Sequence, residues 1–165
     1  MANWHPVTQV IGYQPIETTE TTQKHPEGLI MWARHETFGV SGFIYLKGVA
    51  NTAVGSVVTY DQFLHTTTIA PATGGIGPVA IAMSINVALQ WGWYCIEGSC
   101  PVLAPNAVAP GAEVFMLAAT PGSVDDAVVA SEQILGAVFS ATTPAPVAGQ
   151  ATVMLNRPFL QGRIT

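Results

Sequence analysis

Charged residues are scarce in this sequence. Only 9% of its 165 residues are Asp, Glu, Lys or Arg, whereas soluble domains usually carry about 25%. The surface must therefore be formed largely by Thr, Ser, Asn, Gln, Gly, Pro and Ala. Copies of a protein with such a surface repel one another weakly, which suits a chain that functions while packed against neighbours.

Basic residues are the scarcest of the charged types. The five present are scattered along the chain, and the formal net charge is -5. Without a basic stripe to neutralise phosphates, we expect no nucleic-acid partner. The N-terminus lacks the basic start and long apolar core of a secretion signal. The most apolar run, Val79 to Leu89, is too short to span a bilayer. We therefore expect a soluble protein that is made in a cytosol and has no membrane partner.

Patterns that would carry chemistry are also missing. The four histidines are widely separated, and the glycine-rich residues 72–78 have neither a lysine nor a following helix to bind phosphate. Asp125-Asp126 is the only acidic doublet, and no other oxygen-ligand pattern surrounds it. We predict no catalytic, metal or cofactor site, and therefore no enzyme.

Strand patterns dominate from Leu29 onward. Short runs rich in β-branched and aromatic residues are separated by Gly and Pro at intervals of roughly ten residues. Val79, Ile81, Met83 and Ile85 alternate with small or polar residues, so we expect these four to face the core. Residues 29–165 are predicted to form a single all-β domain, a compact β-barrel or β-sandwich with at most one short helix. A capping box at Ser123 to Asp126 would start that helix, and a loop over residues 123–133 is the alternative.

Residues 1–28 lack the hydrophobic periodicity of the rest. We interpret them as an extended N-terminal arm, mobile in the isolated protein and ordered only on a partner; a disordered terminus is the alternative. The apolar residues of the arm are expected to contact a neighbouring subunit, where an extended segment can add a strand to the edge of its sheet. These contact residues are Trp4, Val7, Val10, Ile11, Tyr13 and Ile16.

Two cysteines lie in the stretch QWGWYCIEGSCPVLA, residues 90–104. Strand alternation on both sides of Glu97-Gly98 predicts a hairpin with a two-residue turn there. Such a hairpin places Cys95 opposite Cys100, close enough for a disulfide, whereas a cytosolic origin favours two reduced thiols. A metal site would need two further ligands, and none has a suggestive spacing.

Several phrases resemble the capsid cement (head decoration) proteins of tailed bacteriophages. They are GFIYLKGVANTAVGSVVTYD (42–61), GPVAIAMS (77–84), GWYCIEG (92–98), LAATPGSVDDAVVA (117–130) and LNRPF (155–159). The resemblance implies a virion structural protein on the outer surface of a phage head, made in the bacterial cytoplasm. It also implies contact with the major capsid protein, whose subunit contacts it would stabilise, and a homo-oligomer, trimer or dimer. The family supplies no catalytic residues to carry over. The alternative is a virion-attached receptor- or glycan-binding β module that would use Trp91, Trp93 or Tyr94 as a stacking platform.

Overall fold

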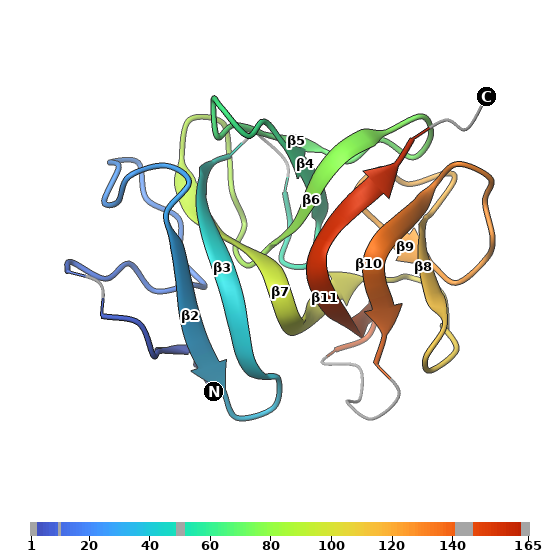
Figure 1. Cartoon of the computed structure of the whole chain (residues 1–165), viewed down its shortest axis with the longest axis horizontal. Coiled ribbons are helices and arrows are strands. Elements are labelled where there is room, and N and C mark those ends of the chain that lie inside the picture. The colour runs from blue at the N-terminus through green and yellow to red at the C-terminus, as the bar shows by residue number, and fades with distance from the viewer. Residues whose placement is uncertain (1–2, 10, 49–51, 141–146, 163–165) are drawn as a thin grey trace.

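The computed structural model describes residues 3–9, 11–48, 52–140 and 147–162, which form an all-β protein without a helix (Figure 1). The predicted all-β class is confirmed. The strands are β1 (His5–Pro6), β2 (Ile30–His35), β3 (Gly39–Lys47), β4 (Val57–Tyr60), β5 (Thr67–Ile69), β6 (Ile76–Ala82), β7 (Trp91–Leu103), β8 (Glu113–Met116), β9 (Val124–Asp125), β10 (Gln133–Phe139) and β11 (Gln150–Gln161).

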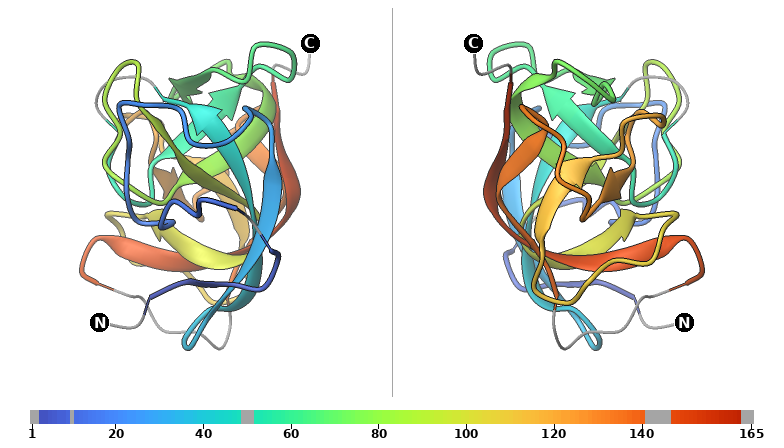
Figure 2. Two further views of the ribbon diagram at one scale, coloured as in Figure 1. Left: turned by 90° about the vertical axis from the view of Figure 1, so that its left-hand side faces the viewer. Right: turned by 90° about the vertical axis from the view of Figure 1, so that its right-hand side faces the viewer.

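All strands belong to one antiparallel sheet. Its order is β1-β2-β3-β7-β6-β11-β10-β8-β9, and the hairpin β4-β5 joins it through β6. Among the described residues the end strands β1 and β9 do not pair with each other, so the sheet is not closed into a barrel. The long strands β7 and β11 bend instead, and the sheet curls around a core, as the side views in Figure 2 show.

Strand β7 is one bent strand, and the predicted hairpin at Glu97-Gly98 is wrong. Residues 91–97 pair with β3 on one edge of β7, whereas on the other edge residues 94–95 pair with β6 and residues 97–103 pair with β11. Gly98 has a φ of +84°, which a residue without a Cβ adopts at little cost. The direction of the chain does change here. The strand does not fold back on itself, because the neighbouring strands β3, β6 and β11 supply the ladder partners of β7.

The core has two parts because several strands are buried on both faces. The main cluster lies inside the curled sheet, and a smaller one gathers the opposite faces of β3, β6 and β7 with the β4-β5 hairpin. On β6, Val79 and Ile81 belong to the main cluster, whereas Ala80 and Ala82 belong to the smaller one. The predicted inward direction of Val79, Ile81 and Met83 is confirmed. The prediction is wrong for Ile85, which is 68% exposed because β6 ends at Ala82.

Because β6 is buried on both faces, we expect substitutions on either face to lower the free energy of unfolding. Ile81→Ala should lower the free energy of unfolding by about 2–5 kcal/mol through cavity formation. Ala80→Leu should lower it by about 1–3 kcal/mol, since the opposite face has no room for added methylenes. Urea denaturation measures both, with Ala127→Leu on an exposed loop as control, expected within about 0.5 kcal/mol. A neutral Ala80→Leu would show that this face of β6 is open.

Residues 123–132 form a short strand and a loop, and Gln133 begins β10. Val124 and Asp125 make β9, which pairs with β8. The Asp125 carboxylate accepts a hydrogen bond from Asn106 Nδ2 at 2.6 Å, and Asp126 Oδ2 accepts one from the backbone N–H of Ala109 at 2.7 Å. The two carboxylates therefore fix the loop before β8, so neither caps a helix.

The N-terminal segment packs along the sheet, as the blue trace beside β2 in Figure 1 shows. Strand β1 pairs with β2 at the edge of the sheet. The backbones of Glu20 and Trp91 exchange two hydrogen bonds of 3.0 and 2.9 Å. The described part of residues 1–28 is thus integrated into the β structure, in contrast to the extended arm that we predicted.

Candidate interaction surfaces

Two of the six predicted contact residues lie inside the protein. Trp4 is 5% exposed and Ile16 is 0% exposed, and both belong to the main core. The Trp4 ring packs edge-on against Phe43 with the ring centroids 4.8 Å apart. The prediction that Trp4 and Ile16 contact another subunit is therefore wrong, because their apolar surface is already buried within the chain.

The other predicted contact residues differ in exposure. Ile11 is 99% exposed and Val7 is 57% exposed, so both are available to a partner. Tyr13 is half-buried, and its hydroxyl donates to the Trp4 carbonyl oxygen at 3.4 Å. Val10 lies outside the described residues.

A buried glutamine holds the N-terminal segment in place. Gln14 Nε2 donates to the Trp91 carbonyl oxygen at 3.1 Å, and its Oε1 accepts from the Tyr45 hydroxyl at 2.8 Å. The Gln14 carbonyl oxygen accepts from Trp93 Nε1 at 3.0 Å. Its backbone N–H donates to His25 Nε2, and burial lowers the pKa of His25, which favours the neutral ring that this bond needs.

The aromatic residues proposed as a glycan-stacking platform are not free to stack. Trp93 is 0% exposed and Tyr94 is 1% exposed, one in each core cluster. Trp91 is half-buried, donates from Nε1 to Glu27 Oε1 at 2.7 Å, and has Lys47 Nζ at 5.4 Å from its ring centroid. The platform predicted for a glycan-binding module is therefore absent at these residues.

Cys95 and Cys100 are free, fully buried thiols on the two arms of bent β7. Burial raises the pKa of Cys100 well above its ordinary value, and a hydrogen bond with Cys95 raises it further. A thiol with a raised pKa carries little thiolate at neutral pH and reacts slowly. Their location assigns them to packing inside the curled sheet.

Two large apolar side chains lie at the tip of the β4-β5 hairpin, where Phe63 is 89% exposed and Leu64 is 67% exposed. Asp61 Oδ1 accepts hydrogen bonds of 2.7 Å from both of their backbone N–H groups, which hold the pKa of Asp61 below its ordinary value. The turn is thus internally braced while its apolar side chains face solvent. We did not predict this pair from the sequence, although two adjacent large apolar residues in an otherwise polar loop indicate an exposed apolar site.

A second apolar loop lies at the same end of the molecule. Ile85, Val87 and Leu89, in the β6-β7 loop, are 68%, 45% and 67% exposed. Backbone bonds attach both loops to the end of β3, since Lys47 donates to the His65 oxygen and Gly48 to the Gln90 oxygen. Figures 1 and 2 show both loops at the upper end. We call Phe63, Leu64, Ile85, Val87 and Leu89 the loop-end residues.

The outward side of β10 and β11 is also apolar. Leu135 pairs across the strands with Phe159, and Val138 pairs with Met154. These side chains are 45%, 42%, 42% and 52% exposed, in that order. We call Leu135, Val138, Met154 and Phe159 the β10-β11 face.

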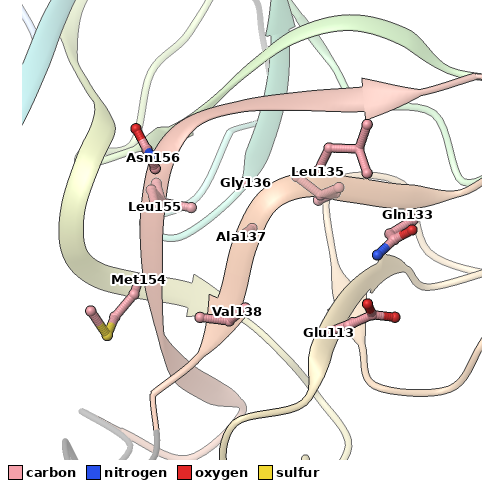
Figure 3. A pocket seen from close by; sticks show the side chains of 10 residues that line it. Glu113, Gln133, Leu135, Gly136, Ala137, Val138, Met154, Leu155 and Asn156 are labelled. Carbon is pink, nitrogen blue, oxygen red and sulfur yellow. The ribbon is translucent and has the colours of Figure 1, made fainter.

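The β10-β11 face contains a hollow of about 390 Å³ beside β8. Gln133 pairs with Phe115 and Val138 pairs with Glu113, which leaves residues 134–137 of β10 opposite Val114 alone. The two strands must therefore separate between these pairs. Figure 3 shows Val138 and Met154 together on one side of the hollow, and Glu113 near Gln133 on the other.

A second hollow, of about 370 Å³, lies between the β5-β6 and β9-β10 loops. Glu132 borders it and is 4% exposed; its Oε1 accepts a hydrogen bond from the Gly74 backbone N–H at 2.5 Å. Its Oε2 is buried and has no hydrogen-bond partner among the described residues. The observed contact ties one loop to the other.

Within the described ranges, no group of three or more His, Cys, Asp or Glu side chains is arranged to hold a metal ion. The described part of the chain contains no helix that is long and apolar enough to cross a membrane. Searches of protein-family models, curated protein sequences and solved structures find no match to this chain. The function must therefore be inferred from the chain's own surfaces.

Proposed function

We propose that the protein is a capsid decoration protein, which binds the outside of a phage head and stabilises contacts between major capsid protein subunits. It acts without catalysis or a cofactor and clusters on the shell as a dimer or trimer. The proposal combines the sequence resemblance with two apolar surfaces on a compact, weakly charged β protein. It is made in the host cytoplasm and then resides on the virion.

The main support for the proposal is the exposure of Phe63 and Leu64 on a turn that hydrogen bonds to Asp61 hold in place. Solvent-exposed aromatic and aliphatic side chains of this size supply binding energy when a partner covers them. The hydrogen bonds from Asp61 fix the turn in advance, so that little conformational entropy is lost on docking. We assign the loop-end residues to the capsid contact. The exposed Val7 and Ile11 from the predicted arm contribute where the capsid surface reaches them.

The aromatic residues do not favour the alternative function. A glycan-binding module needs exposed rings for stacking, but Trp93 and Tyr94 are buried. Copy number separates the two functions, because a decoration protein covers the shell whereas a receptor-binding module occurs in few copies. Imaging of particles that carry the protein measures this directly.

Replacing Phe63 by Ser should weaken binding to capsids. Loss of a buried aromatic anchor costs about 2 kcal/mol, or roughly 30-fold in affinity, while the free energy of unfolding stays within about 0.5 kcal/mol. Co-sedimentation of purified protein with heads assembled without it measures the affinity. Thermal denaturation of the decorated heads measures the protection.

Val128→Ser is the matched control, since Val128 is 81% exposed and belongs to the β9-β10 loop, which contributes none of the loop-end residues. It should bind as the wild type does. If the Phe63 variant and the control bind capsids with equal affinity, the loop-end residues are not part of the capsid contact. Failure of the wild-type protein to bind any such head would refute the decoration function.

A further inference from the structure

We infer that His25 is a pH-sensitive latch, whose neutral ring holds the N-terminal segment on the sheet and whose protonated ring loosens it. The inference concerns the chain between β1 and β2 and is independent of the capsid contact. It follows from the hydrogen bond that the ring accepts, from the aromatic side chains that pack against the ring, and from the charges around it.

The His25 ring is buried against two strands of the sheet. It is 4% exposed, and its centroid lies 5.1 Å from the ring of Tyr45 on β3 and 5.4 Å from that of Trp93 on β7. Its Nε2 accepts a hydrogen bond from the backbone N–H of Gln14 at 3.3 Å. Gln14 and His25, which both belong to the N-terminal segment, are thus docked together on β3 and β7.

Only the neutral ring can make the bond to Gln14. A deprotonated Nε2 offers a lone pair, whereas protonation turns both ring nitrogens into donors. Nε2–H of a protonated His25 would face the Gln14 N–H, donor against donor. Gln14 also accepts hydrogen bonds from Trp93 Nε1 and from the Tyr45 hydroxyl. A shift of Gln14 away from the ring therefore disturbs three buried hydrogen bonds together.

The surroundings of His25 do not compensate a positive charge on the ring. The titratable groups around it are the Tyr45 hydroxyl, the adjacent Lys24, and the carboxylates of Glu20 and Glu27, whose charges act on Tyr45. Burial raises the pKa of Tyr45, so its hydroxyl stays neutral. Within the described ranges His25 makes no ion pair with either carboxylate. Burial consequently lowers the pKa of His25.

Acid should therefore open the latch. The unfolded chain protonates His25 at an ordinary pKa of about 6.5, whereas the folded chain protonates it only at lower pH. Below about pH 6.5 the unfolded state thus binds more protons, so the stability of the fold decreases as the pH falls. Between about pH 7.5 and about pH 5.5 this effect raises the unfolding equilibrium constant by up to about tenfold.

Urea denaturation of the wild-type chain and of His25→Gln at these two pH values tests the latch. Gln offers an oxygen that can accept the Gln14 N–H, but it takes up no proton. We expect acidification to raise the unfolding equilibrium constant about threefold or more further in the wild type than in His25→Gln. His5→Gln removes an exposed histidine on β1 and should retain the wild-type pH dependence.

NMR of the wild-type chain supplies a second measurement, which does not depend on the folding of a variant. The His25 ring should take up its proton at a lower pH in the folded chain than in the urea-unfolded chain. As it does so, the Trp93 indole N–H, which donates to the Gln14 carbonyl oxygen, should lose protection against hydrogen exchange.

A His25 ring that titrates at or above about pH 6.5 in the folded chain overturns the inference. Equal pH dependence of the wild type and His25→Gln also overturns it, because the destabilising proton would then bind elsewhere. So does a pH dependence that His5→Gln removes as completely as His25→Gln does. Binding to phage heads enters none of these measurements, so failure of the decoration function leaves the latch standing.

Discussion

A chain that lacks residues 1–24 is expected to show no cooperative unfolding transition. The deletion removes Trp4 and Ile16 from the main core and exposes the surfaces of β2, β3 and β7 that they cover. It also removes Gln14, which leaves the buried Trp93 indole N–H and the Tyr45 hydroxyl without their observed partners. Circular dichroism during thermal and urea denaturation measures the outcome.

Point substitutions separate the contributions. Trp4→Ala should lower the free energy of unfolding by about 3–5 kcal/mol, and Ile16→Ala by about 2–5 kcal/mol. Ile11→Ala is the control from the same segment, since Ile11 is 99% exposed, and should have an effect within about 0.5 kcal/mol. A truncated chain that unfolds cooperatively at the wild-type urea midpoint would show that residues 1–24 are an appendage after all.

The N-terminal segment shows why its packing could not be predicted from local sequence. Its apolar residues do not alternate at a strand or helix period, and only Trp4 and Ile16 among the described ones are fully buried. The segment is ordered by bonds between residues distant in sequence, such as Gln14 to Trp91 and Trp93. Low periodicity indicates absence of regular structure, which differs from absence of packing.

The strand pattern could be predicted because it depends on neighbouring residues. Alternation along Val79 to Met83 and the Gly and Pro punctuation were sufficient for the all-β class. Pairing was harder, because the order β3-β7-β6-β11 joins strands that are far apart in the chain. Burial of Ala80 and Ala82 depends on that order, since the β4-β5 hairpin and β3 build the second cluster around them.

The interaction surfaces also depend on pairing. Leu135 and Phe159 are unremarkable apolar residues in the sequence, and only the β10-β11 register brings them together on an exposed face. The hollow arises from a register shift between Gln133 and Val138. The scarcity of charge favours a protein that packs against neighbours, but composition cannot indicate which exposed faces are apolar.

Gly98→Ala is expected to be among the most destabilising single substitutions, at about 3 kcal/mol or more. Part of this cost is general, since an L-residue in the left-handed region loses about 1–2 kcal/mol and Gly98 has a φ of +84°. The remainder is specific to the site. A Cβ at Gly98 would lie 2.6 Å from Ser41 Oγ and 2.7 Å from the Val40 carbonyl oxygen. Backbone atoms of β3 cannot move aside without breaking their pairing with β2.

Gly39→Ala isolates the two parts of that cost. Gly39 has a nearly equal φ of +77°, but a Cβ there would meet nothing within 4 Å. The control should therefore lose only the general conformational cost of about 1–2 kcal/mol, measured by urea denaturation of both variants. A larger loss at Gly98 would show that β3 packs directly against the bend of β7, where the pairing with β3 ends and the pairing with β11 begins. Equal losses would mean that the bend is sustained by the backbone conformation of Gly98 alone, and that the start of β3 yields to an added methyl group.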